Sequence, residues 1–120
     1  MDLGLKDKVA LVTGAASPKG FGKEIALILA REGCDVAVAD LDITEAEKTA
    51  GDIESTGQKA IAVKVDVSNR DEVDEMIKIV LEKLEKIDIL VNNAGASSPL
   101  KPFIEMSKED WDLDIGVNLY

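Results

Sequence analysis

A glycine-rich turn near the N-terminus has the residue types that bind a phosphate. Its sequence is TGAASPKGFGKEIA, in which Gly14, Gly20 and Gly22 follow the pattern G-x5-G-x-G. Glycines leave room for a pyrophosphate to approach backbone N–H groups and the positive end of a helix dipole. The same pattern is compatible with a tight turn that only packs a helix closely against a strand. The turn therefore indicates a candidate phosphate site, with a purely structural reading still open.

Two acidic residues follow later strand-like runs. Asp40 ends the run DVAVAD, 18 residues after Gly22, near the spacing at which an acid accepts hydrogen bonds from the adenosine ribose. Asp66 ends the run AIAVKVD and should lie at the same edge of a parallel sheet, close to the adenine region. Either residue could instead be an acid in a solvated turn or beside a helix start.

The sequence NNAG (92–95) closes a fourth strand-like run. Small residues allow a chain to pass against a bound cofactor, and asparagine amides can tie neighbouring strand ends together. Taken alone, NNAG could be only a turn.

The elements that would position these residues alternate between strands and helices. Four apolar runs have the length of buried strands, namely KVALVT (8–13), DVAVAD (35–40), AIAVKVD (60–66) and IDILVNN (87–93). Segments with helical features separate them, at 21–33, 44–55 and 69–85. Parallel strands joined by helices predict an open, doubly wound α/β sheet with helices on both faces. In the order 3-2-1-4, the run 87–93 would form one edge.

Capping residues and apolar spacing predict where the helices begin and which residues they contain. Capping boxes predict three helix starts, at Thr44 with Glu47, Ser68 with Asp71, and Ser107 with Asp110. In the first helix, the large apolar residues at helical spacing are Phe21, Ile25, Ile28 and Leu29. In the third, one apolar stripe is predicted to face the core, made of Val73, Met76, Ile77, Val80 and Leu84. The segment 107–120 has no helix stop signal, so we expect the sequence to end inside a helix.

Composition limits the possible partners. The chain has 24 Asp and Glu against 14 Lys and Arg, a formal net charge of −10. Such a surface repels nucleic acid and anionic membranes, so we expect neither as a partner. A length of 120 residues with 46% hydrophobic residues predicts one globular domain. We find no apolar run as long as a membrane span and expect a cytoplasmic protein.

Cysteine and histidine usage gives no sign of a metal site. The chain has no histidine and one cysteine, Cys34, so it lacks the residue sets of a zinc site or a catalytic triad. Cys34 follows Gly33 directly before a strand-like run, and we expect it to be a small core residue.

Together, the ordered motifs resemble the short-chain dehydrogenase/reductase family. The landmarks are TG at 13–14 with a glycine pair ending at Gly22, Asp40, DV at 66–67, NNAG at 92–95, and VN at 117–118 after Trp111. The resemblance extends over essentially the whole chain, and NNAG and W-x6-N are its specific parts. It implies a Rossmann-like, three-layer αβα domain over residues 1–120. It also implies an oxidoreductase that transfers a hydride between a nicotinamide cofactor and a small-molecule alcohol or ketone.

The resemblance further implies which residues contact the cofactor. Those expected at the pyrophosphate are Gly14, Ser17, Gly20, Phe21 and Gly22, with Lys19 in the same turn. Those expected at the adenosine are Asp40 and Leu41 at the ribose, and Asp66 and Val67 at the adenine. Asn93, Ala94 and Gly95 would pass beside the cofactor, while Asp88 and Asn92 would brace the sheet. Asn118 matches the family's catalytic asparagine, which holds a helix kink and a water of the proton relay.

The sequence departs from the family pattern in three ways. The usual TG-x3-G-x-G is longer here by two residues, so we expect residues 17–19 to bulge. Phe21 stands where a smaller aliphatic residue is usual. The family's catalytic serine and Tyr-x3-Lys pair would lie beyond position 120, and the only tyrosine is Tyr120. We therefore expect a sequence truncated after the fourth strand and the following helix, and inactive by itself.

Asp40 indicates which cofactor to expect. Its carboxylate can accept hydrogen bonds from two ribose hydroxyls but would repel the 2′-phosphate of NADP. At about 4 Å and a dielectric near 20, this repulsion is on the order of 4 kcal/mol before screening. NAD is therefore expected over NADP, although Lys19 could offset part of the repulsion. The family resemblance implies a homo-oligomer.

Two other functions fit parts of the pattern. One is a non-catalytic dinucleotide-binding or regulatory module. The other is a receiver domain in which Asp66 accepts a phosphoryl group, but such a domain needs acidic metal ligands after the first strand, where this chain has Thr13 and Gly14.

Overall fold

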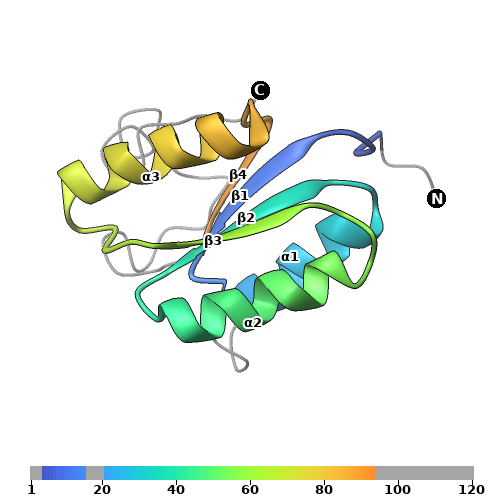
Figure 1. Ribbon diagram of the computed structural model, residues 1–120, viewed down its shortest axis with the longest axis horizontal. Helices are drawn as coiled ribbons and strands as arrows, with labels where there is room; N and C mark the ends of the chain where they lie inside the picture. The colour runs from blue at the N-terminus through green and yellow to red at the C-terminus, as the bar shows by residue number, and fades with distance from the viewer. Residues whose placement is uncertain (1–3, 16–20, 94–120) are drawn as a thin grey trace.

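Strands and helices alternate along the chain (Figure 1). The structure is a computed structural model that describes residues 4–15 and 21–93. In this part of the chain the elements are β1 (Val9–Thr13), α1 (Phe21–Arg31), β2 (Asp35–Asp40), α2 (Ile43–Glu54), β3 (Ala60–Lys64), α3 (Arg70–Leu84) and β4 (Ile89–Asn92). The predicted order of elements is confirmed, while β1, β3 and β4 are each shorter than the predicted apolar runs.

The four strands form one parallel sheet in the order β3-β2-β1-β4. The register pairs Thr13 with Ala39 on one side and with Asn92 on the other. Helix α3 covers one face of the sheet and helices α1 and α2 cover the other, which gives three layers (Figure 1). The predicted α/β sheet and its strand order are confirmed, and within the described residues β4 is an edge strand.

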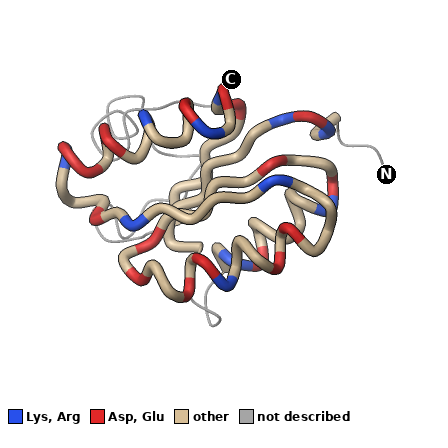
Figure 2. Tube along the Cα trace, in the orientation of Figure 1, with Lys and Arg blue, Asp and Glu red and all other residues tan. Residues whose placement is uncertain are grey.

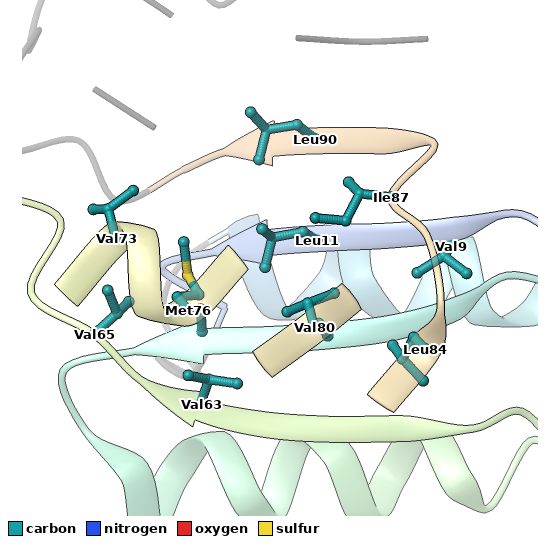
Figure 3. Packing of buried hydrophobic residues seen from close by; sticks show 12 residues of the cluster. Val9, Leu11, Val63, Val65, Val73, Met76, Val80, Leu84, Ile87 and Leu90 are labelled. Carbon is teal, nitrogen blue, oxygen red and sulfur yellow. The ribbon is translucent and has the colours of Figure 1, made fainter. Parts of the chain in front are cut away.

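The strands are apolar on both faces because each face has its own helix layer. Alternate residues of β1 separate into two clusters: Leu11 packs on the α3 side and Val12 on the side of α1 and α2. The predicted stripe of α3 lies in the first cluster, where Val73, Met76 and Val80 point toward the sheet (Figure 3). Ile77 is partly buried against the same cluster.

Helix α1 buries small residues and leaves two of its large apolar residues exposed. Phe21 and Ile28 are 75% and 48% exposed, whereas Gly22, Ala26 and Ala30 are buried. The helix predicted from the spacing of these residues is confirmed, and its buried face is lined by small side chains. Residues four apart share one face of a helix, and small side chains there let α1 approach β1 and β2 closely.

The two described helix caps also differ from the predicted ones. Asp42 caps α2, and its carboxylate accepts a hydrogen bond from Glu45 N–H at 3.1 Å. Asn69 caps α3 and accepts one from Glu72 N–H at 3.2 Å. The capping boxes at Thr44 and Ser68 are therefore wrong, because the helices begin at neighbouring residues whose side chains are equally good acceptors. The box at Ser107 lies outside the described residues.

Cys34 is a core residue, as predicted. It is fully buried, and its Sγ donates a hydrogen bond to the carbonyl of Leu5 at 3.4 Å. Burial raises the pKa of the Cys34 thiol, and the nearby carboxylates of Asp35, Asp88 and Glu32 raise it further.

Charged residues lie mainly on the helices and at the strand ends, while the central stretches of β1 and β2 carry none (Figure 2). Among the residues that the structure describes, we find no helix with the length and apolar character needed to cross a membrane.

Candidate functional site

The chain leaves β1 through a sharp turn at the carboxyl end of the sheet. Gly14 has a φ of 66°, a left-handed conformation that glycine adopts without steric cost. Its N–H donates to the carbonyl of Ala39 at 2.8 Å, which extends the β1–β2 ladder by one bond. The start of the glycine-rich turn is therefore fixed to the sheet.

Gly22 in the first turn of α1 lies directly against this backbone. A Cβ on Gly22 would overlap the carbonyl oxygen of Gly14 and lie 2.7 Å from Nδ2 of Asn93. Any side chain at position 22 would force the helix away from the sheet. Close packing thus explains this glycine, and it places the N-terminus of α1 at the end of β1.

A hydroxyl group joins the ends of β1 and β4. Thr13 is fully buried, and its Oγ1 donates to Oδ1 of Asn92 at 3.1 Å and accepts from the backbone N–H of Asn93 at 3.2 Å. The side-chain amide of Asn93 donates to the carbonyl of Gly14 at 3.3 Å. Asn92 therefore braces the sheet as expected, and Asn93 lies beside the turn. The motifs mark Thr13 only as part of the TG landmark, and this bracing role was not predicted, although a hydroxyl residue at the end of an apolar strand could have indicated it.

Four predicted adenosine residues line one pocket. Its volume is about 120 Å³, and it lies where β1, β2 and β3 end. The lining residues are Gly14, Ala39, Asp40, Leu41, Val65, Asp66 and Val67. The walls are therefore mainly apolar, with one carboxylate after each of two neighbouring strands.

The two acids of this pocket are held by the backbone that follows them. Oδ1 of Asp40 accepts from Asp42 N–H at 3.1 Å. Oδ1 of Asp66 accepts from the hydroxyl of Ser68 at 2.6 Å and from its N–H at 2.9 Å. The hydroxyl bond, followed by the backbone bond, lowers the pKa of Asp66 against a smaller opposing effect of burial. Asp66 is thus ionised at neutral pH.

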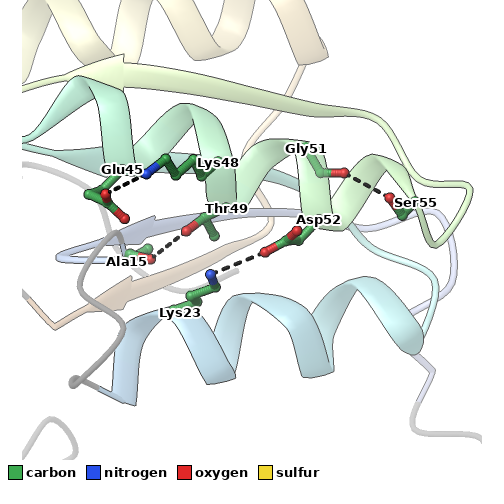
Figure 4. Close-up of polar contacts among 8 residues, drawn as sticks. All are labelled: Ala15, Lys23, Glu45, Lys48, Thr49, Gly51, Asp52 and Ser55. Atoms are coloured by element: carbon green, nitrogen blue, oxygen red, sulfur yellow. Dashed lines mark hydrogen bonds and ion pairs between the residues drawn. The ribbon is translucent and has the colours of Figure 1, made fainter.

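Helix α2 contacts the glycine-rich turn and helix α1 (Figure 4). The hydroxyl of Thr49, fully buried, donates to the carbonyl of Ala15 at 3.4 Å. One helical turn away, Lys23 of α1 and Asp52 of α2 form an ion pair at 3.1 Å. Neither contact was predicted, because each joins residues about 30 positions apart.

Asp88 lies at the opposite end of the sheet and braces it, as expected. Its Oδ2 accepts from Val9 N–H at 2.9 Å and is 3.1 Å from Nζ of Lys86. Burial alone would raise the pKa of Asp88, but the bonds from Val9 and Lys86 outweigh it and the pKa is lowered. Asp88 is therefore part of the scaffold and not of the site.

The structure brings together many of the predicted site residues at one edge of the sheet. These are Gly14, Gly22, Asp40, Leu41, Asp66, Val67 and Asn93. Phe21 begins α1 next to Gly22 and is largely exposed. The other candidates lie outside the described residues, namely Ser17, Lys19, Gly20, Ala94, Gly95 and Asn118. Over residues 4–15 and 21–93, no three Asp, Glu, Cys or His side chains group as metal ligands.

Comparisons with known proteins agree on one family. The sequence model of the family described as short chain dehydrogenase matches residues 8–120. A 3-oxoacyl-[acyl-carrier-protein] reductase of Synechocystis sp. is 44% identical over 96% of this chain. A (2S)-[(R)-hydroxy(phenyl)methyl]succinyl-CoA dehydrogenase subunit of Thauera aromatica is 37% identical over 98% of it. The chain spans about half the length of these relatives, 46% of each.

A solved structure agrees as well. The L-sorbose reductase of Gluconobacter frateurii, complexed with NADPH and L-sorbose, superposes with a TM-score of 0.74 at 33% identity. The match covers 94% of this chain and 42% of that structure.

Proposed function

Because this chain belongs to the short-chain dehydrogenase family, we propose that it forms the nucleotide-binding half of an oxidoreductase that uses NAD to interconvert an alcohol and a ketone. The pocket at the strand ends is the observation that carries this proposal, since it combines an apolar wall with Asp40 and Asp66.

The adenosine fits the chemistry of this pocket. Val67 provides apolar surface for a base, and Asp40 provides a carboxylate for the ribose hydroxyls. The Asp42 N–H bond to Asp40 fixes one carboxylate oxygen, so the acceptor is oriented before a ligand arrives. We propose that Asp40 and Leu41 hold the ribose and that Asp66 and Val67 contact the adenine.

The close packing of Gly22 in α1 against Gly14 supports a pyrophosphate site beside these two residues. The overlap that a Cβ on Gly22 would make with Gly14 shows that the backbone here approaches as closely as glycine permits. The N-terminus of α1 therefore lies beside Gly14. The free N–H groups and the dipole at a helix N-terminus favour an anion there. We propose that Gly14, Phe21 and Gly22, together with Ser17, Lys19 and Gly20, bind the phosphates.

A preference for NAD over NADP follows from Asp40. A second negative charge at the ribose 2′ position would meet this carboxylate, and Asp66 lines the same pocket. The L-sorbose reductase, which resembles this chain in structure, is complexed with NADPH, so we do not base the preference on the fold. The proposed preference therefore rests on the negative charge of Asp40 and Asp66 in this pocket.

The chemistry of the reaction needs groups beyond this pocket. The nicotinamide ring of a bound cofactor supplies or accepts the hydride. We propose that Asn93, Ala94 and Gly95 lie beside the cofactor, and that Asn118 takes part in the proton relay. The sequence contains no Tyr-x3-Lys, so we expect the 120-residue chain to bind cofactor without turning over a substrate. The family also leads us to propose a homo-oligomer, which light scattering after size-exclusion chromatography would test.

Calorimetry with NAD, NADP and adenosine tests the proposal directly. We expect NAD to bind more tightly than NADP, and adenosine to bind weakly to the same site in competition with NAD. Tighter binding of NADP would overturn the cofactor preference. An absence of binding by all three ligands to folded protein would overturn the nucleotide site itself.

A further inference from the structure

Thr49 makes a polar contact between helix α2 and the backbone that follows β1. The residue lies in the middle of α2, and its side chain is fully buried between the helix and the sheet. Its Oγ1 donates to the carbonyl of Ala15, directly after Gly14, and the two groups face each other across the layer (Figure 4). A buried hydroxyl is costly without a partner, so its place here depends on the Ala15 carbonyl.

This contact links the two ends of the proposed nucleotide site. Asp40 ends β2, and the carboxylate of Asp42, two residues later, caps α2. Thr49 lies two helical turns further along and holds the backbone of Ala15. The start of the glycine-rich turn is thereby fixed from three sides, by β2 through Ala39, by β4 through Asn93, and by α2 through Thr49.

The ion pair between Lys23 and Asp52 lies within the layer of α1 and α2 and does not replace this contact. Lys23 and Asp52 pair near the surface, with 26% and 55% of their side chains exposed, and their ion pair joins α1 to α2. An exposed pair of this kind is weakly directional and is screened by salt. The Thr49 hydroxyl acts from a buried position on the backbone of the turn itself.

We propose that Thr49 is a positioning residue for the phosphates of the cofactor. Its hydroxyl holds Ala15 and so fixes the backbone after Gly14 in the arrangement that receives the pyrophosphate. This inference rests on the proposed nucleotide-binding function. It adds to that function a residue that touches no ligand and acts through the turn.

Ligands with and without phosphates separate this role from simple packing. Thr49→Val keeps the shape of the side chain and removes the hydroxyl. We expect NAD and ADP to bind about ten-fold more weakly to this variant, about 1.4 kcal/mol, while the affinity for adenosine changes less than about two-fold. Thr49→Ser, which keeps the hydroxyl, should restore NAD binding. Thr44→Val is the matched control, because Thr44 lies on the same helix and is exposed.

The possible outcomes are distinct. Equal affinities of wild type and Thr49→Val for NAD and ADP would overturn the proposal, as would an equal loss for adenosine, which would indicate general damage to the site. If Thr49→Val does not fold, Thr49→Ser and Thr49→Ala carry the same comparison, with weak ADP binding expected only for Ala. If wild type binds none of these ligands, the proposed function fails instead.

Discussion

The carbonyl oxygen of Gly14 fills the space that a side chain on Gly22 would need. Gly14 directly follows β1 and Gly22 lies in the first turn of α1, and their contact sets the distance between the sheet and the helix N-terminus. Nδ2 of Asn93 also lies close to Gly22 and donates to the carbonyl of Gly14. The ends of β1 and β4 and the start of α1 therefore meet where the phosphates are proposed to bind.

Gly22→Ala should therefore weaken both folding and nucleotide binding. Inserting a methyl group into a closed contact costs about 1–3 kcal/mol of unfolding free energy. We expect a loss in this range by urea denaturation, together with weaker NAD binding. Gly51→Ala is the matched control, because a Cβ on this helical glycine meets nothing within 4 Å. It should instead stabilise the protein by about 0.5–1 kcal/mol. Equal stability of Gly22→Ala and wild type would contradict the close contact.

Asp40→Asn should narrow the difference between the two cofactors. The amide keeps the size of the side chain and removes the charge that opposes a 2′-phosphate. We expect the ratio of the NADP and NAD dissociation constants to fall about ten-fold, about 1.4 kcal/mol, measured by calorimetry. Glu82→Gln removes one charge from an exposed residue of α3 outside the pocket and should leave the ratio unchanged. The same ratio in Asp40→Asn and wild type would rule out a role for this carboxylate in discrimination.

Thr13→Val should loosen the connection between β1 and β4. The variant keeps the shape of the residue but leaves the side-chain carbonyl of Asn92 and the N–H of Asn93 without their partner. Such a loss at a buried site costs about 1–3 kcal/mol, which chemical denaturation would measure. Thr13→Ser keeps the hydroxyl and should lose less. If the Val and Ser variants are equally stable, the hydroxyl does not hold the two strands.

Asp88 should make stability depend on pH in the acid range. Its folded pKa is lowered, so its contribution is fully present above the ordinary aspartate pKa of about 3.9 and is lost as the pH falls through the lowered folded value. Asp88→Asn should cost about 1 kcal/mol at pH 7, mainly through the weakened bond from Val9 N–H. Denaturation at pH 7 and near pH 2 should show this difference shrinking in acid. The same difference in stability at both pH values would argue against an ionised Asp88. Lys86→Met should lower stability less than Asp88→Asn, because Lys86 is half exposed.

The sequence alone determined the order of the elements and which strand ends meet. Apolar runs of strand length, separated by helical periodicity, leave few arrangements open, and carboxyl ends of parallel strands must share one edge. The sequence therefore predicts that Asp40 and Asp66 lie close together, and in the structure they line one pocket. The stripe of α3 was predictable because Val73, Met76, Val80 and Leu84 recur at helical spacing, and these residues are buried.

Tertiary packing decided which face of α1 is buried and which groups hold the turn. Phe21 and Ile28 are large and apolar but exposed, because the close approach of α1 to the sheet favours Gly22, Ala26 and Ala30 on the buried face. The bonds from Thr13 to Asn92 and from Thr49 to Ala15 join residues far apart in the chain, and single hydroxyl groups have no periodic signal. Local patterns report what a segment can form by itself, whereas these contacts depend on the distances between layers, which are set only when the layers pack.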